Sequence, residues 1–371
     1  MNLKTDDDIN SLWDVSYFIG NKETGIYCFP WCIYQRDTKD LICFETRQEA
    51  ENTAYSPCKN CCSITPIGSW EEAEQDIFIN LPVEFNMEAN LNYMLRDKNE
   101  CLFEINDGTI TRALAFDEHR SIVQIMATEN NQLRVNFLGD TRPKERYQRA
   151  EIVRYIREWF DLDTHLSTFY DLAKTDPFLM KPVQDFYGLR IIGIPDLFEA
   201  LCWGILGQQI NLRFAYILKK QFVEKFGDFI EWDCKKYWIF PSYKKIASLT
   251  PDDLSDIKMT MKKSEYIIGI AQLMASGELS KAKLMKLNHF NEIEKSLIKI
   301  RGIGPWTANY VLMRCLRFPS AFPIEDVGLI NAIKSLAHMD RKPTKEEIRT
   351  IAIPWENWEA YATFYLWRVL Y

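Results

Sequence analysis

The sequence lacks any apolar run that approaches the ~20 residues needed for a membrane-spanning helix. Its first ten residues, MNLKTDDDIN, are acidic and contain no apolar stretch of the kind found in secretory signals. The chain also lacks the composition of disordered proteins, because 47% of its residues are hydrophobic and 26% are charged. No internal repeat or low-complexity tract is visible. We therefore expect an ordered, cytoplasmic protein that does not contact a membrane.

An overall excess of basic residues is absent as well: 45 Lys and Arg stand against 52 Asp and Glu, a formal charge of −7. Over the whole chain, this balance argues against nucleic-acid binding. The charges are segregated, however. Residues 1–200 hold 20 basic and 34 acidic side chains, whereas residues 201–320 hold 19 basic and 11 acidic ones, or +8. Such asymmetry accompanies binding to a polyanion, but a solvated basic face explains it about as often.

Two closely spaced Cys pairs stand near the N-terminus. Three residues separate Cys28 from Cys32, two separate Cys58 from Cys61, and 25 lie between the pairs. Without a secretory signal a disulfide framework is not expected, and two such pairs let four thiolates converge tetrahedrally on one Zn²⁺ ion. The alternative is a set of unrelated buried Cys, which are common core residues.

The length of 371 residues predicts two or three domains. After the Cys-rich segment, residues 64–82 resemble a linker with two Pro, and short β-type apolar runs fill residues 101–138. The periodicity becomes helical from residue 143 onward. Helix-start signals follow at 194–196, 250–252 and 344–347, the last a capping box.

Together these features predict an α+β multidomain fold in three parts. Residues 1–68 are expected to form a small zinc-binding module with four cysteine ligands. Residues 75–185 are expected to form a β-rich domain, and residues 186–371 an all-α domain.

The most informative segment is LIKIRGIGPWTANY at residues 297–310. An apolar helix ends at Gly302, and a second begins near Pro305, where proline suits the first helical turn. Gly302 and Gly304 carry no side chains and expose backbone N–H groups beside a helix N-terminus, a ready site for a DNA phosphate. Most turns of this kind only reverse the chain, so the pattern alone is weak.

A second candidate follows 22 residues after Gly304. Phe318-Pro319 and Phe322-Pro323 bracket a short loop, after which Asp326 precedes a helical sequence. From the residues alone, the better interpretation of Asp326 is a helix N-cap.

The hairpin, its continuation Thr-Ala-Asn-Tyr (307–310) and the loop before Asp326 closely resemble the HhH-GPD superfamily of DNA repair glycosylases. Residues 198–209 and 354–362 resemble its 3-methyladenine DNA glycosylase II (AlkA-type) branch. The resemblance covers residues 75–371 and implies that the β-rich domain is TBP-like. It implies a monomeric base-excision repair enzyme that hydrolyses the N-glycosidic bond of alkylated bases, such as 3-methyladenine and 7-methylguanine, in double-stranded DNA.

The resemblance assigns roles to individual residues. Asp326 would be the catalytic carboxylate, which stabilises positive charge on the deoxyribose. Trp306, Tyr310 and Trp358 would form an electron-rich pocket that attracts cationic bases, with core packing as the alternative for each ring. Gln209 would fill the space that the flipped base vacates. The expected DNA-binding set is Gln208, Gln209, Gly302, Ile303, Gly304 and Thr307.

The chain lacks two features that other members of the superfamily carry, and each missing feature excludes one type of chemistry. Lyase-competent members carry a nucleophilic Lys where this chain has Trp306, so no Schiff base forms there. No Cys lies beyond Cys315, which excludes the iron–sulfur loop of other members. The glycosylase chemistry needs no cofactor, although the hairpin carbonyls of Ile298, Ile300 and Ile303 would allow a monovalent cation. Two other hypotheses remain open: a zinc-dependent DNA-damage sensor whose helical domain only holds DNA, and a bifunctional glycosylase/lyase.

Residues 12–65 resemble the Ada-type metal-binding domain, through TGIYC at 24–28 and YSPCKNC at 55–61. This resemblance implies Zn²⁺ on the four Cys. It also implies that one Cys, by position Cys28, accepts a methyl group from a methylated DNA phosphotriester.

The Ada-like segment departs from the family at two positions. Phe29 replaces the Arg that usually follows the first Cys, and Trp31 replaces a small residue. The missing Arg removes a phosphate anchor. No helix-turn-helix is visible at 63–80 to carry a transcriptional signal. We therefore prefer a structural zinc site that adds a DNA contact, with methyl transfer to Cys28 as the alternative.

Overall fold

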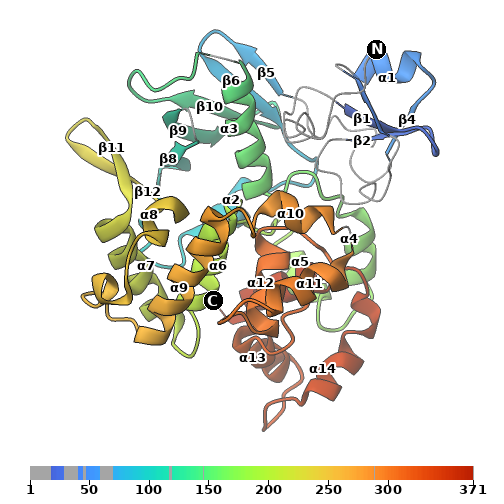
Figure 1. Cartoon of the computed structure of the whole chain (residues 1–371). Helices are drawn as coiled ribbons and strands as arrows, with labels where there is room; N and C mark the ends of the chain where they lie inside the picture. The colour runs from blue at the N-terminus through green and yellow to red at the C-terminus, as the bar shows by residue number, and fades with distance from the viewer. Residues whose placement is uncertain are drawn as a thin grey trace. The chain divides into compact units, whose positions relative to one another are not determined.

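The computed structural model describes residues 18–28, 41–44, 47–58, 70–116, 119–144, 146–287 and 289–370 (Figure 1). The chain divides into two compact units. The first unit comprises residues 1–83, 103–165 and 229–237, and the second comprises residues 84–102, 166–228 and 238–371. No helix in the described part of the chain is long and apolar enough to cross a membrane.

The described part of the Cys-rich segment is a small four-stranded sheet with the strand order β3-β1-β2-β4. Its elements are β1 (Phe18–Asn21), β2 (Ile26–Cys28), β3 (Leu41–Phe44), α1 (Arg47–Asn52) and β4 (Ser56–Pro57). The buried side chains of Tyr27, Phe44 and Ala50 form its core. A Cβ on Gly20 would lie 2.5 Å from the Phe44 ring, so this tightly packed core requires glycine there.

The main sheet of the first unit has six antiparallel strands in the order β5-β6-β10-β9-β8-β7. Leu133 and Val135 are buried while Arg134 between them is exposed, the alternation of a sheet with one buried face. The α+β class and the predicted strands are confirmed by β7 (Phe103–Asn106), β8 (Thr109–Ala115), β9 (Arg120–Ala127), β10 (Gln132–Phe137) and the following helix α3 (Arg146–Trp159).

The prediction of a linker over residues 64–82 is wrong for its second half. A hairpin of β5 (Trp70–Ala73) and β6 (Asp76–Asn80) lies there, and β6 pairs with β10. Ile77 and Ile79 of β6 are fully buried. The sequence conceals this strand because its apolar run is short, acidic residues precede it, and β10, which pairs with it on one side, lies far along the chain.

The second unit is helical. Two predicted helix starts are confirmed, since Asp196 caps α6 and Thr344 forms a capping box with Glu347 at α14. The third, at Thr250, opens only a short 3-10 turn. The elements are α2 (Met87–Met94), α4 (Ser167–Ala173), α5 (Met180–Asp185), α6 (Leu197–Leu206), α7 (Leu212–Phe226), α8 (Tyr243–Ala247), α9 (Met261–Ala275), α10 (Lys281–Lys286), α11 (Phe290–Ile298), α12 (Pro305–Arg314), α13 (Val327–Leu336), α14 (Lys345–Ile351) and α15 (Glu359–Trp367), with 3-10 turns at Pro251–Leu254, Ile353–Trp355 and Arg368–Leu370.

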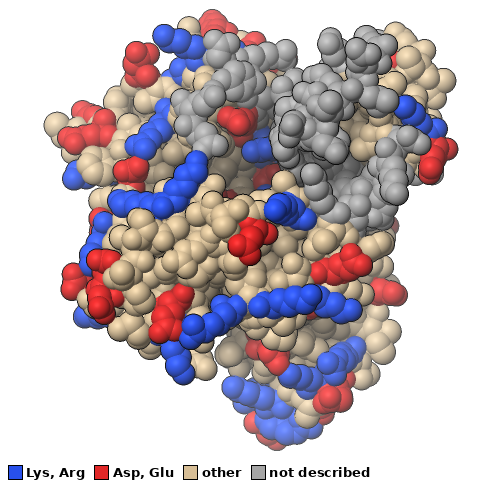
Figure 2. All heavy atoms as spheres, viewed as in Figure 1, with Lys and Arg blue, Asp and Glu red and all other residues tan. Residues whose placement is uncertain are grey.

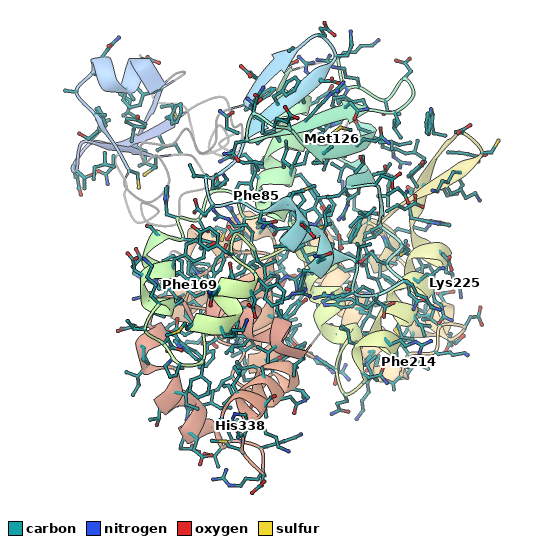
Figure 3. All side chains as sticks on the ribbon, turned by 180° about the vertical axis from the view of Figure 1, so that it is seen from behind. Phe85, Met126, Phe169, Phe214, Lys225 and His338 are labelled. Atoms are coloured by element: carbon teal, nitrogen blue, oxygen red, sulfur yellow. The ribbon has the colours of Figure 1, made fainter. Side chains whose placement is uncertain are left out.

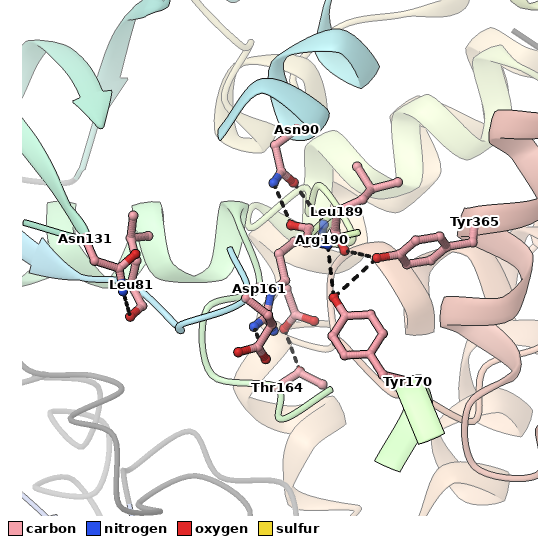
Figure 4. A network of polar contacts seen from close by, with 11 residues as sticks. Leu81, Asn90, Asn131, Asp161, Thr164, Tyr170, Leu189, Arg190 and Tyr365 are labelled. Atoms are coloured by element: carbon pink, nitrogen blue, oxygen red, sulfur yellow. Dashed lines mark hydrogen bonds and ion pairs between the residues drawn. The ribbon is translucent and has the colours of Figure 1, made fainter. Parts of the chain in front are cut away.

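Buried polar contacts connect distant segments of the second unit (Figure 4). The Asn90 side chain of α2 accepts a hydrogen bond from the backbone N–H of Arg190 at 2.9 Å. The Tyr365 hydroxyl of α15 donates to the carbonyl of Leu189 at 2.9 Å. Residues 84–102 therefore group with the helices, although the sequence assigns them to the β-rich domain.

A β-hairpin interrupts the sequence where the periodicity predicts helix. Strands β11 (Asp228–Trp232) and β12 (Lys235–Ile239) pair with each other, and residues 229–237 group with the first unit. The turn residues Asp233 and Cys234 have φ of 51° and 58°, the left-handed conformation that a two-residue hairpin turn needs. The sequence signal is weak because such turns usually contain glycine, and this one does not.

Candidate active site and DNA interface

The carboxylate of Asp326 lies at the start of α13 and accepts three hydrogen bonds. As the N-cap residue it accepts the backbone N–H of Leu329 on Oδ1 at 2.9 Å. The indole N–H of Trp367 donates to the same oxygen at 2.8 Å, and the indole N–H of Trp306 donates to Oδ2 at 3.0 Å. The N-cap role and a catalytic role are therefore compatible, because the helix uses only one of the two oxygens.

An ionised carboxylate offers about four acceptor positions, two on each oxygen. Oδ1 of Asp326 uses both of its positions, whereas Oδ2 accepts only the Trp306 N–H from the described residues. One lone pair of Oδ2 is therefore left for a water molecule or for a positive charge. Asp326 and Trp306 are both partly exposed, so a ligand can reach them.

Gly328 allows Trp367 to reach this carboxylate. A Cβ at Gly328 would lie 2.9 Å from Asp326 Oδ1 and 2.9 Å from Cδ1 of Trp367. A larger residue at this position would displace the carboxylate, the indole ring or both. The contact between Asp326 and α15 thus depends on this glycine.

Three rings form an aromatic stack (Trp306, Tyr310 and Trp367) next to the carboxylate. The ring centroids of Trp306 and Tyr310 lie 5.4 Å apart, and those of Tyr310 and Trp367 lie 6.4 Å apart. Burial raises the pKa of Tyr310 to about 12, and its hydroxyl accepts a hydrogen bond from Arg314 at 2.8 Å. Tyr310 is thus a fixed, neutral support at physiological pH, and Trp306 is the more exposed of the two rings on α12.

Sequence reasoning missed the partners of this stack. Trp367 lies in an apolar helix, where an aromatic residue usually indicates core. The Tyr93 hydroxyl accepts a hydrogen bond from Arg314 at 3.2 Å, and the Arg96 guanidinium lies 4.1 Å from the centroid of the Tyr93 ring. No spacing rule connects Tyr93 and Arg96 with the hairpin, because they precede the helical part of the sequence.

The third predicted pocket residue, Trp358, has other neighbours. Its ring lies 5.8 Å from that of Phe169 on α4, labelled in Figure 3, and 6.0 Å from that of Tyr361. Among the described residues, no recorded contact joins Trp358 to Asp326 or to the aromatic stack. The structure therefore brings two of the three predicted pocket aromatics together with Asp326, whereas Trp358 is half-buried and packs against Phe169 and Tyr361.

The turn between α11 and α12 contains two glycines with different requirements. Gly302 has φ of +94°, and a Cβ there would lie 2.4 Å from the Tyr266 ring. Gly304, the N-cap of α12, has φ of −91° and open space where a Cβ would stand. The fold itself therefore needs glycine at 302 but not at 304. Glycine at 304 leaves the N–H groups at the start of α12 open to an anion such as a DNA phosphate.

The other DNA-binding candidates divide into one exposed residue and several supporting ones. Gln209 is exposed and has φ of +57°, uncommon for a residue other than glycine. The Gln208 side chain donates to the carbonyl of Gly302 at 2.9 Å and to Oγ1 of Thr307 at 3.2 Å. Thr307 and Ile303 are buried. Gln209 thus fits a wedge position, whereas the other three side chains support the hairpin from inside.

We expect Gly304→Ala to fold normally and to weaken binding to duplex DNA by about tenfold, because the added methyl group crowds a phosphate contact worth ~1.4 kcal/mol. Base release from the bound complex should change less. Fluorescence anisotropy and thermal unfolding measure the two effects. Gly302→Ala is the contrast, since its strained φ predicts lost stability. An unchanged affinity of Gly304→Ala would show that the hairpin does not touch DNA.

Three known families match consecutive parts of the chain. The metal-binding domain of Ada matches residues 7–63, the N-terminal domain of 8-oxoguanine DNA glycosylase matches residues 81–201, and the HhH-GPD superfamily of base excision DNA repair proteins matches residues 202–358. The DNA-3-methyladenine glycosylase of Bacillus subtilis (strain 168) is 66% identical over 303 residues, which are 82% of this chain and 100% of that protein. The chain belongs to the DNA-3-methyladenine glycosylase family.

More distant members of this glycosylase family extend the comparison. DNA-3-methyladenine glycosylase 2 of Escherichia coli (strain K12) is 26% identical over 71% of this chain and 86% of its own length. The solved 3-methyladenine DNA glycosylase of Archaeoglobus fulgidus shares the fold, with a TM-score of 0.66 at 24% identity over 78% of this chain and 97% of that one. The predicted family and architecture are confirmed.

In this glycosylase, two of the four candidate zinc ligands lie at the ends of neighbouring strands: Cys28 ends β2, and Cys58 directly follows β4. Strands β2 and β4 are parallel, and the backbone N–H of Cys58 donates to the carbonyl of Tyr27 at 2.9 Å. Cys28 and Cys58 are both buried. Cys32 and Cys61 lie outside the described residues. The first Cys of each pair is thus placed beside the other, as a site built from two turns requires.

Proposed function

We propose that this chain is a monofunctional DNA glycosylase that releases alkylated bases, of the 3-methyladenine and 7-methylguanine type, from double-stranded DNA. Alkylation at N3 or N7 makes a purine cationic, so the base leaves readily and needs little acid catalysis. The enzyme must instead stabilise the positive charge that develops on the deoxyribose. The observation that carries the proposal is the carboxylate of Asp326, oriented by two indole N–H donors and with one lone pair of Oδ2 open.

Gln209 and Trp306 supply the remaining functions that the reaction needs. The target base must leave the stack at a cost of roughly a few kcal/mol, and the exposed Gln209 is suited to fill the vacated space. A cationic base that stacks on Trp306 gains cation–π attraction of roughly 0.5–2 kcal/mol. Trp306 also stands where a lyase needs its amine, so water rather than a Lys is the expected nucleophile.

The proposed DNA interface is the turn between α11 and α12 of the helical unit, where Gly304 caps the N-terminus of α12. Residues 201–320 carry the +8 charge that would complement the phosphate backbone. Figure 2 shows Lys and Arg side chains in a broken band across the helical unit, with acidic side chains between them. We propose that the enzyme acts as a monomer in the cytoplasm, since one chain carries both the hairpin and Asp326.

The proposal is tested by incubating the full chain with methylated duplex DNA and measuring free 3-methyladenine together with strand cleavage. We expect base release without cleavage of the abasic strand. Binding without release would favour the DNA-damage sensor, and cleavage that accompanies release would favour the bifunctional glycosylase/lyase. Either result would overturn the monofunctional assignment.

We also propose a monovalent cation on the hairpin carbonyls of Ile298, Ile300 and Ile303. In that case, exchanging K⁺ for a bulky organic cation should weaken DNA binding.

We expect Trp306→Ala to lose more activity on cationic bases than on a neutral lesion such as hypoxanthine, because only cationic bases gain cation–π attraction. Trp306→Phe is the matched control: it keeps a ring but removes the N–H donor to Asp326, so both substrates should slow by a similar factor. Single-turnover excision on the two substrates measures the ratio. Equal losses for Trp306→Ala on both substrates would reduce Trp306 to a shape or packing role.

For the N-terminal module we propose a structural Zn²⁺ site on Cys28, Cys32, Cys58 and Cys61. Its support is the adjacent placement of Cys28 and Cys58 and the match to the Ada metal-binding domain. The second candidate function is methyl transfer to Cys28, since a zinc-bound thiolate is a strong nucleophile unless hydrogen bonds quench it. Phe29 in place of Arg argues against it.

We expect the intact protein to carry zinc and to show no adduct after incubation with DNA that contains methyl phosphotriesters. Native mass spectrometry measures the metal, and peptide mass spectrometry measures Cys28. One methyl group transferred to the Cys28 sulfur would overturn the purely structural assignment. Absence of zinc from protein purified without chelators would overturn the site itself.

A further inference from the structure

Lys263 is a buried lysine in the first turn of α9. It is 8% exposed, and its ammonium donates to the carbonyls of Leu206 and Gln208, both at 2.8 Å. Leu206 is the last residue of α6, so its carbonyl is one of those that a helix leaves without an internal partner. Lys263 therefore binds the main chain on both sides of Gly207, where α6 ends.

This placement costs the folded protein stability. A positive charge near the N-terminus of its own helix opposes the dipole of α9, although the C-terminus of α6 attracts it. Burial lowers the pKa of Lys263, and no carboxylate of the described residues forms an ion pair with it. The two hydrogen bonds to the carbonyls of Leu206 and Gln208 offset part of this cost, because without them these acceptors would lose their donor.

The loop that follows α6, which contains Gly207, Gln208 and Gln209, is also attached to the hairpin between α11 and α12. The Gln208 side chain donates to the carbonyl of Gly302 and to Thr307, as described above. A Cβ on Gly204 would lie 2.6 Å from Cγ2 of Thr307, so α6 and α12 pass each other closely at this point. Gln209 follows directly, exposed and in the left-handed conformation. The exposed residue thus lies on a loop that α9 and the hairpin both hold.

We propose that Lys263 is a positioning residue for base flipping: with Gln208, it holds the α6–α7 loop (residues 207–211) on the hairpin, so that Gln209 enters the duplex at a fixed place relative to the bound phosphate. The inference rests on the proposed glycosylase function and on the wedge role of Gln209. Insertion of a wedge competes with base stacking, so it succeeds only if the loop does not yield. A charged donor that binds two carbonyls resists this displacement better than packing alone.

The test compares Lys263→Met, which keeps the length of the side chain, with Lys281→Met. Lys281 is the matched control because its ammonium also donates to a carbonyl, that of Pro195 at 3.0 Å, elsewhere in the helical unit. We expect Lys263→Met to slow single-turnover excision from duplex DNA about tenfold, to leave excision of the same base from single-stranded DNA nearly unchanged, and to reduce the fluorescence gain of a 2-aminopurine beside the lesion. Lys263→Arg should restore most of the duplex rate, and Lys281→Met should match wild type.

A double-mutant cycle identifies the route of the effect. If Lys263 acts through Gln209, Lys263→Met should add almost no loss in a Gln209→Ala background. Additive losses, or equal losses on duplex and single-stranded DNA, would overturn the inference. If wild type releases no base from either substrate, the glycosylase function fails, while the 2-aminopurine signal still decides whether Lys263 affects flipping. Should Lys263→Met not fold, Gln208→Leu takes its place with the same expected and opposing results.

Discussion

Asp326→Asn should bind methylated duplex DNA nearly as well as wild type and release base at least about 10²- to 10³-fold more slowly. Asn keeps the size of the side chain and a good N-cap acceptor, but it removes the negative charge that stabilises the transition state. It also places an amide N–H₂ against one of the two indole donors, Trp306 or Trp367, so the orientation of the side chain is lost with the charge.

The measurement is single-turnover release of free 3-methyladenine, with affinity from fluorescence anisotropy on the same duplex. Asp176→Asn is a matched control, because Asp176 also accepts an indole N–H, that of Trp355 at 2.8 Å, and backbone N–H groups at 2.9 and 3.0 Å. This control should lower thermal stability without slowing base release. A folded Asp326→Asn variant that released base at the wild-type rate would exclude the catalytic assignment.

Trp367→Phe should slow base release by about 10- to 100-fold while DNA affinity stays close to wild type. Phenylalanine fills most of the indole volume but cannot donate to Oδ1 of Asp326. The carboxylate would then keep only the N-cap bond on that oxygen and could rotate toward Trp306. A carboxylate in a wider range of orientations stabilises the developing charge less well, so the loss should fall on the chemical step.

The matched control for Trp367→Phe is Trp355→Phe, which removes the same kind of indole–carboxylate bond at Asp176. Both variants should lose a similar stability, about 1–3 kcal/mol, because each leaves a carboxylate with one donor fewer. Only Trp367→Phe should slow release, as judged by single-turnover rates set beside thermal unfolding curves. Equal slowing by both variants would mean that stability, not the position of Asp326, sets the rate.

Much of the candidate site could be predicted because it depends on local backbone preference. Gly302 has a positive φ, Pro305 begins α12, and Asp326 caps α13. In each case the residue type alone favours the conformation that the structure has. The capping box at Thr344 is confirmed for the same reason. These features involve residues within a few positions of one another, so they are visible in a short stretch of sequence.

The partners of these residues could not be predicted in the same way. The family resemblance placed Trp306 near Asp326, but Trp367 lies 41 residues after Asp326, and no spacing rule selects it from the other Trp of the chain. The place of strand β6 in the main sheet was concealed because β10, which pairs with it on the side away from β5, comes much later. The role of Lys263 is likewise invisible, since its bonds are to backbone carbonyls that every residue possesses.

The sequence by itself determined the family, the α+β class, the Cys pairs and the positions where the hairpin turns and where α13 begins. Only the tertiary structure decided which side chains meet: two indoles on one carboxylate, Gln208 on the hairpin, and residues 84–102 among the helices. The physical reason is that turns and caps follow from the conformational preferences of a few adjacent residues. Contacts between distant residues depend instead on the packing of a whole unit, where close approach and burial decide between alternatives that look alike in the sequence.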